Sequence, residues 1–92
     1  MRFEWDVGKA ARNLAKHGLS FQEAATVLGD PLSVTFSDPD HSRAEDRFIT
    51  IGHTRRGRLV LVAHADRGRN VRIVSAREAT ASERKIYEES GK

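Results

Sequence analysis

The run Leu59–Ala65, LVLVAHA, is the feature that most limits the fold of this 92-residue chain. Its first five residues are all apolar, so a strand formed here would be buried on both faces and would lie in the middle of a sheet. The segments before and after it, Thr54–Arg58 and Asp66–Asn70, contain Gly57 and Gly68 and read as hairpin connections. We therefore expect a central strand with an antiparallel neighbour on each side.

The other strands are predicted from β-branched residues and turn signals. They are expected over Leu32–Ser37, over Arg47–His53 and from Val71 to about Ala76. Phe3–Trp5 is short and is expected to form an edge strand or a hydrophobic plug. The expected sheet is antiparallel and has three to four strands.

Asp6 and Gly18 delimit the first predicted helix, as N-cap and C-terminal stop. An apolar repeat predicts which face of this helix is buried, and Asn13 is expected to face away from it. The residues of the expected buried stripe are Val7, Ala10, Ala11 and Leu14.

Two further helices are predicted by capping boxes, Ser20–Glu23 and Thr80–Glu83. Gly29 and Pro31 should end the second helix. A helix-turn-helix is rejected, because Gln22 and Thr26 are nearly all that the second helix offers to a DNA groove. The third helix carries Ile86 and Tyr87 as its only large apolar residues.

These elements describe one α+β domain over residues 1–92, with two N-terminal helices, an antiparallel sheet and a short C-terminal helix. The chain has no cysteine, which is compatible with a reducing compartment. No apolar run approaches the length of a membrane span, and MRFEWD does not resemble a signal peptide. A cytoplasmic protein without membrane contact is expected.

Positive charge is concentrated in one segment of a chain whose net charge is +3. Between His53 and Arg77 there are seven arginines and a single acid, Asp66. A planar guanidinium grips a phosphate at two points, and such basic blocks usually meet nucleic acid or an acidic protein. Arg67, Arg72 and Arg77 are the best candidates for specific contacts because they adjoin regular structure.

Neither a metal site nor a nucleotide-cofactor site is supported. The four histidines, at positions 17, 41, 53 and 64, lack the spacing of metal ligands. Asp38, Asp40 and His41 are close in sequence, but two acids and a histidine around Pro39 are commonly just a turn. No phosphate-binding glycine motif is present, and we expect no cofactor.

The arginine-rich hairpins suggest RNA cleavage. This reaction needs a base for the 2′-OH proton, positive donors for the pentacoordinate phosphate, and an acid for the leaving 5′ oxygen. We expect Arg67 and Arg77 to converge on one phosphate at the rim of the sheet. The proton-transfer candidates are Glu45, His53, Glu83 and Tyr87. The alternatives are a non-catalytic RNA- or DNA-binding module and a structural partner of an acidic protein.

Two elements, Lys16-His17-Gly18 and Ile73–Arg77, in this order, resemble the BrnT family of toxins from bacterial type II toxin–antitoxin systems. The resemblance extends over nearly the whole chain. Its longer matching segments are Phe3–Asp6, Asn13–Phe21, Glu45–Gly52 and Arg72–Tyr87.

The resemblance implies a RelE-like ribonuclease fold, metal-independent RNA cleavage, inhibition of translation and growth arrest. It also implies a cognate BrnA-type antitoxin, a DNA-binding protein through which the toxin reaches operator DNA. The catalytic candidates by position are Arg67, Arg77, Glu83 and Tyr87. The candidates for RNA binding are Arg47, Arg55, Arg56, Arg72 and His17.

Overall fold

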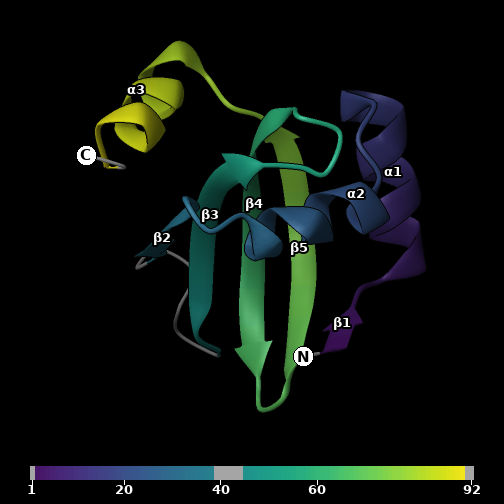
Figure 1. The fold of residues 1–92 in the computed structure, drawn as a ribbon. Helices are drawn as coiled ribbons and strands as arrows, with labels where there is room; N and C mark the ends of the chain where they lie inside the picture. The colour runs from purple at the N-terminus through teal and green to yellow at the C-terminus, as the bar shows by residue number, and fades with distance from the viewer. Residues whose placement is uncertain (1, 39–44, 91–92) are drawn as a thin grey trace.

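A five-stranded mixed sheet forms the centre of the computed structural model, which describes residues 2–38 and 45–90 (Figure 1). The strand order is β1-β5-β4-β3-β2, so the predicted central strand, β4, is the middle one. The strands are β1 (Arg2–Glu4), β2 (Val34–Ser37), β3 (Arg47–His53), β4 (Leu59–Arg67) and β5 (Asn70–Glu78). We call the end where β3 ends and β4 begins the upper end, as drawn in Figure 1, and the opposite end the lower end.

The expected sheet of three to four antiparallel strands is wrong in one respect. β1 adds a fifth strand and runs parallel to β5, with Phe3 opposite Val71. The other neighbouring strands pair antiparallel, as expected. β1 lies at the sheet edge, but its partner comes from the far end of the chain, and no local turn signal relates the two segments.

Alternation along β4 produces two hydrophobic clusters, one on each face of the sheet. Val60 and Val62 are fully buried beneath the N-terminal helices, on what we call the helix face. Leu59 lies on the opposite face, the open face, where it packs with Ile51 and Tyr87. The chain therefore buries β4 on both sides, as its apolar run predicts.

α1 (Val7–His17) has the predicted caps but buries a different face. Asp6 accepts the Lys9 N–H at 2.8 Å, and Gly18 adopts φ 63°. Val7 is 80% exposed and Leu14 52%, whereas Asn13 is buried. Ala10 packs against the core as predicted, but the rest of the predicted stripe is wrong, because a polar anchor at Asn13 sets the docked face.

α2 (Phe21–Ala25) is shorter than predicted and continues as a 3₁₀ helix, η1 (Thr26–Gly29). The Ser20 hydroxyl caps α2 by accepting the Glu23 N–H at 3.0 Å. The Thr26 hydroxyl donates to the Glu23 carbonyl at 2.6 Å, which competes with regular helix bonding at the point where the helix tightens.

α3 (Ala81–Ser90) begins where the capping box predicts. Glu83 accepts the Thr80 N–H at 2.9 Å, and the Thr80 hydroxyl accepts the Glu83 N–H at 3.2 Å. Only Tyr87 is buried, and Ile86 is 40% exposed. α3 is therefore held to the open face largely by polar side chains. In the described part of the chain, no helix is long and apolar enough to cross a membrane.

Candidate functional site

Arg67 and Arg77 lie at opposite ends of the sheet, so the expectation that they converge on one phosphate is wrong. Arg77 pairs with Leu61 near the start of β4, and Arg67 pairs with Asn70 at its end. Leu61 and Arg67 are six positions apart, which corresponds to about 20 Å at a rise of about 3.3 Å per residue. The reason is the β4–β5 hairpin, because its turn places Arg67 beside the start of β5 and Arg77 at the far end.

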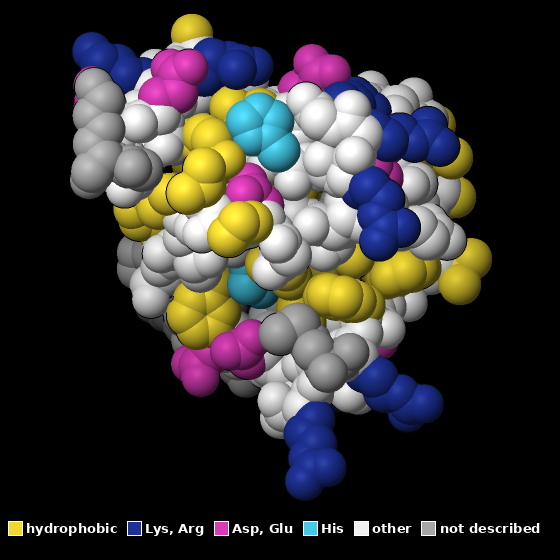
Figure 2. Space-filling model, viewed as in Figure 1, with side chains coloured by type: hydrophobic (Ala, Val, Ile, Leu, Met, Phe, Trp, Pro, Cys, Tyr) yellow, Lys and Arg dark blue, Asp and Glu magenta, His cyan; other side chains and the backbone are white. Residues whose placement is uncertain are grey.

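Ion pairs engage the arginines of the lower end. Arg67 Nε lies 3.5 Å from Glu4 Oε1. Arg47 and Arg72 both contact Glu45 Oε1, with Arg47 Nε at 3.3 Å. Glu45, a candidate for proton transfer, therefore lies with the lower-end arginines and away from Arg77. On the face drawn in Figure 2, basic side chains gather toward the top and bottom of the molecule, with hydrophobic side chains between them.

Arg77 and Glu83 form a two-point ion pair at the upper end. Arg77 Nη1 and Nη2 donate to Glu83 Oε1 and Oε2 at 2.8 and 2.9 Å. The hydrogen bonds from Arg77 outweigh the effect of burial and lower the pKa of Glu83 to about 2. The same bonds raise the pKa of Arg77. Glu83 is thus a weak base whose two oxygens are occupied, while 40% of the Arg77 side chain stays exposed.

Glu83→Gln should reduce stability at neutral pH, because the variant keeps the capping oxygen but loses the charge that pairs with Arg77. Since the folded pKa of about 2 lies below the ordinary value of 4.5, the contribution of Glu83 to stability is complete above about pH 5 and is lost as pH falls toward 2. We expect a loss of about 1 kcal/mol at pH 7, discounted for the exposure of Arg77, and a smaller difference from wild type at pH 3.

Urea denaturation of both proteins at pH 7, 5 and 3 measures this effect. Glu88→Gln is the matched control, because Glu88 is exposed on the same helix. A pH-independent difference between Glu83→Gln and wild type would contradict the assignment.

Tyr87, His53 and Asp30 form a second polar cluster at the upper end. The Tyr87 hydroxyl donates to Asp30 Oδ2 at 2.8 Å and lies 3.1 Å from His53 Nδ1. The two rings meet edge to face, with centroids 5.1 Å apart. Asp30 Oδ2 also accepts the backbone N–H of His53 at 2.9 Å, and Oδ1 accepts that of Leu32 at 2.9 Å.

The charges in this cluster follow from its hydrogen bonds. Burial raises the pKa of Asp30, but the N–H groups of His53 and Leu32 and the Tyr87 hydroxyl outweigh it, so the net pKa is lowered. Burial, together with the bond to ionised Asp30 and its charge, raises the pKa of Tyr87. Asp30 is therefore a carboxylate and Tyr87 a neutral phenol near pH 7. Tyr87 as a whole is 8% exposed, and its hydroxyl bonds within the cluster.

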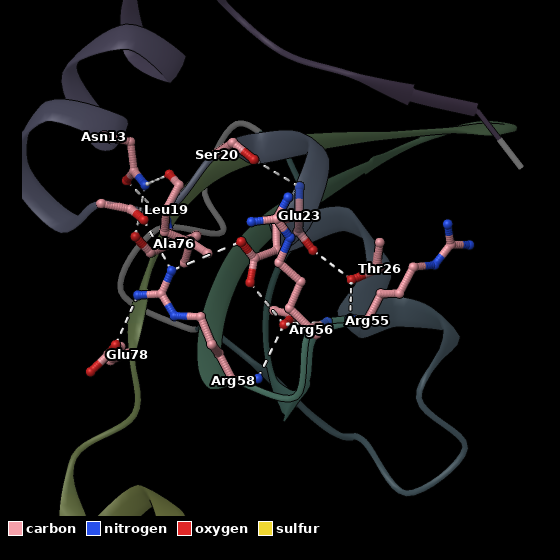
Figure 3. Close-up of polar contacts among 12 residues, drawn as sticks. Asn13, Leu19, Ser20, Glu23, Thr26, Arg55, Arg56, Arg58, Ala76 and Glu78 are labelled. Atoms are coloured by element: carbon pink, nitrogen blue, oxygen red, sulfur yellow. Dashed lines mark hydrogen bonds and ion pairs between the residues drawn. The ribbon is translucent and has the colours of Figure 1, made fainter.

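The β3–β4 hairpin is fixed onto α2 and the end of α1 (Figure 3). The Thr54 hydroxyl donates to Glu23 at 2.9 Å, and the Arg55 N–H donates to the Thr26 hydroxyl at 2.8 Å. Arg58 donates to the Gly18 carbonyl at 3.0 Å and to Glu78 at 2.8 Å. This frame holds the hairpin rigidly at the upper end.

Arg55 and Arg56 are exposed at the tip of that hairpin, and the guanidinium of Arg55 points away from the other side chains labelled in Figure 3. His17 is half-buried in the last turn of α1, next to Gly18, which accepts from Arg58. Three of the five predicted RNA-binding residues therefore lie toward the upper end, and Arg47 and Arg72 lie at the lower end.

A pocket of about 760 Å³ opens beside the second cluster. Asp30 and His53 line it together with Thr26, Thr54 and Arg55. Its other lining residues are Phe3, Gln22, Ala25, Leu28 and Gly29, from β1, α2 and η1. A histidine, a carboxylate and an exposed arginine therefore form part of the wall of a pocket that lies along the N-terminal elements. Within residues 2–38 and 45–90, no group of three or more acidic or histidine side chains is placed to hold a metal ion. Of the loop residues Asp38, Asp40 and His41, considered above as metal ligands, Asp40 and His41 lie outside the described residues.

Sequence reasoning missed Asp30, which it passed over between two helix-stop signals, Gly29 and Pro31. Its local signal is an aspartate in a turn, where its side chain accepts the N–H two residues on. Its partners His53 and Tyr87 are 23 and 57 positions away in sequence. No pattern within one element relates these three residues.

Comparison with known proteins identifies a family and a similar solved structure. The model of a family described as "Ribonuclease toxin, BrnT, of type II toxin-antitoxin system" matches residues 5–83. The crystal structure of the Brucella abortus ribonuclease toxin BrnT is similar, with a TM-score of 0.67 and 26% sequence identity. The alignment covers 87% of this chain and 97% of the Brucella chain. No curated protein matches the sequence.

Proposed function

Because this chain belongs to the BrnT family of ribonuclease toxins of type II toxin–antitoxin systems, we propose that it cleaves RNA without a metal ion and so inhibits translation and growth. The observation that carries the proposal is the grouping at the upper end. Arg77 lies there with part of its guanidinium exposed, His53 lines a pocket, and Arg55 borders the same pocket.

Arg77 is proposed to bind the scissile phosphate. A guanidinium has five N–H donors, and two of its nitrogens already face Glu83, which fixes the orientation of the group before substrate binds. A preorganised cation stabilises the pentacoordinate phosphate without reorganising during the reaction. Glu83 is proposed to orient Arg77. Tyr87 is the third of the proposed catalytic residues at the upper end.

Five further arginines, Arg47, Arg55, Arg56, Arg67 and Arg72, are proposed to contact the RNA backbone. Arg55 and Arg56 are exposed beside the pocket and suit nucleotides next to the cleaved bond. Arg47, Arg67 and Arg72 lie too far away for the same phosphate and suit more distant nucleotides. For Arg67 this replaces the catalytic role expected from the sequence.

A cognate antitoxin follows from membership of a type II family. We propose that it is a DNA-binding BrnA-type protein and that the toxin reaches operator DNA only through it. A RelE-like classification of the fold belongs to the same proposal. So does a cytoplasmic location, since the RNA substrate and the antitoxin are both found in the cytoplasm.

Incubation of the purified protein with RNA in EDTA tests the function. We expect defined cleavage products in EDTA, and growth arrest on expression that co-expression of the antitoxin relieves. Intact RNA in the presence of demonstrably folded protein would contradict the proposal. Salt-sensitive RNA binding without product would instead support a non-catalytic binding module.

A further inference from the structure

The hydrogen bonds around Tyr87 determine which nitrogen of His53 carries the proton. The Tyr87 hydroxyl has a single hydrogen, which it donates to the Asp30 carboxylate. Its oxygen is therefore left as an acceptor for His53 Nδ1, 3.1 Å away. In the neutral imidazole Nδ1 is then the N–H nitrogen, and Nε2 holds the lone pair.

The free nitrogen is accessible. The His53 side chain is 42% exposed and lines the pocket at the upper end. Among the described residues, no protein group bonds Nε2. The titratable groups that face the imidazole are Asp30 after η1 and Tyr87 from α3, and the charged Arg55 of the hairpin lines the same pocket. A substrate hydroxyl that approaches the exposed side of His53 would therefore find an unoccupied acceptor.

The other candidates for the base are occupied or distant. Both oxygens of Glu83 accept from Arg77. Tyr87 is a buried residue, and the single hydrogen of its hydroxyl is donated to Asp30. Glu45 contacts Arg47 and Arg72 at the lower end. Of the four residues considered for proton transfer, His53 alone combines an accessible acceptor with a fixed orientation.

We propose that His53 is the general base of the RNA cleavage, and that Asp30 and Tyr87 are positioning residues that fix its tautomer and orientation. This inference rests on the proposed function. His53 Nε2 takes the proton of a ribose 2′-OH while the 2′ oxygen forms a bond to phosphorus and the bond from phosphorus to the 5′ oxygen breaks. Water protonates the leaving 5′ oxygen, and His53 later releases its proton to water. The products are a 2′,3′-cyclic phosphate and a 5′-hydroxyl.

The chain Asp30–Tyr87–His53 also spans three elements, the loop after η1, α3 and the end of β3. His53 pairs with Leu59, and Arg77 pairs with Leu61 on the other side of β4. Directly paired residues share a face of the sheet, so His53 and Arg77 both project from the open face. α3 carries Glu83 to one of them and Tyr87 to the other, one helical turn apart.

His53→Gln tests the base, because the amide can still bond Tyr87 but cannot transfer a proton. We expect cleavage to fall by about 10²-fold or more. A general base works only after it has lost its proton, so the rise of the wild-type rate with pH should be absent from the variant. Lys85→Gln on exposed α3 is the control and should retain the wild-type rate and its pH rise.

RNA with sulfur in place of the leaving 5′ oxygen separates base from acid. A thiolate leaves without a proton, so this substrate rescues the loss of a general acid but not the loss of a general base. We expect the same loss for His53→Gln on both substrates. Tyr87→Phe keeps the ring and should lose about tenfold, as expected for one hydrogen bond, while retaining the pH rise. His53→Ala should recover part of its rate when imidazole is added.

Three outcomes overturn the inference. Activity of His53→Gln within a few-fold of wild type, or rescue by the sulfur substrate, removes His53 as the base and leaves the ribonuclease function standing. A His53→Ala variant that is folded by circular dichroism and insensitive to imidazole also counts against it. Wild-type protein that cuts no RNA overturns the inference and the proposed function together.

Discussion

Arg77→Ala should lower RNA cleavage by about 10³-fold and abolish growth arrest. Removing one preorganised donor from a developing oxyanion costs about 10²–10³-fold, and loss of a phosphate-binding arginine costs about 10³–10⁵-fold in phosphoryl transfer. Cleavage of labelled RNA in EDTA gives the rate, and expression without antitoxin gives the growth phenotype.

Two variants sharpen this experiment. Arg77→Lys keeps the positive charge but loses the two-point geometry, so it should recover only a small part of the rate. Arg69→Ala removes an exposed arginine from the β4–β5 turn and should leave the rate unchanged. Near wild-type cleavage by folded Arg77→Ala would place the scissile phosphate elsewhere.

Asn13→Leu should lower the free energy of unfolding by about 3–5 kcal/mol. The Asn13 side chain donates to the carbonyls of Leu19 and Ala76, at 3.0 and 2.9 Å, and accepts the Ala76 N–H at 3.1 Å. Each backbone group left buried without a partner costs about 1–3 kcal/mol. A chain of 92 residues has a total stability of about 5–14 kcal/mol, so the variant should lose much of it.

Urea denaturation followed by circular dichroism measures this loss. Arg12→Leu is the neighbouring control, because Arg12 is exposed on the same helix and should change stability by about 0.5 kcal/mol or less. A loss below about 1 kcal/mol in Asn13→Leu would show that the amide does not hold α1 to β5.

Elements with local signals were predictable from the sequence. The Asp6, Ser20 and Thr80 caps depend on residues three positions apart, and each forms the expected bond. β3 has its predicted bounds, and the run from Leu59 identified the central strand, because alternation and burial are local properties of a strand.

Features that depend on distant partners were not predictable in the same way. Asn13 was read as a solvent-facing residue because its three bonds go to Leu19 and Ala76. β1 was ambiguous because three residues carry too little alternation to fix a parallel partner. The separation of Arg67 and Arg77 could have been predicted, since the predicted hairpin turn already places the two residues far apart along the strands.

The docking of α3 has a further consequence. The helix has a single buried side chain, and its attachments run through Glu83 and Tyr87. On the proposed mechanism, these two side chains orient the phosphate-binding Arg77 and the base His53. One local opening of α3 therefore disorders both at once while the sheet stays folded. Amide exchange in α3 would report the population of the competent enzyme, and a shift in that equilibrium would change the active fraction of the toxin in proportion.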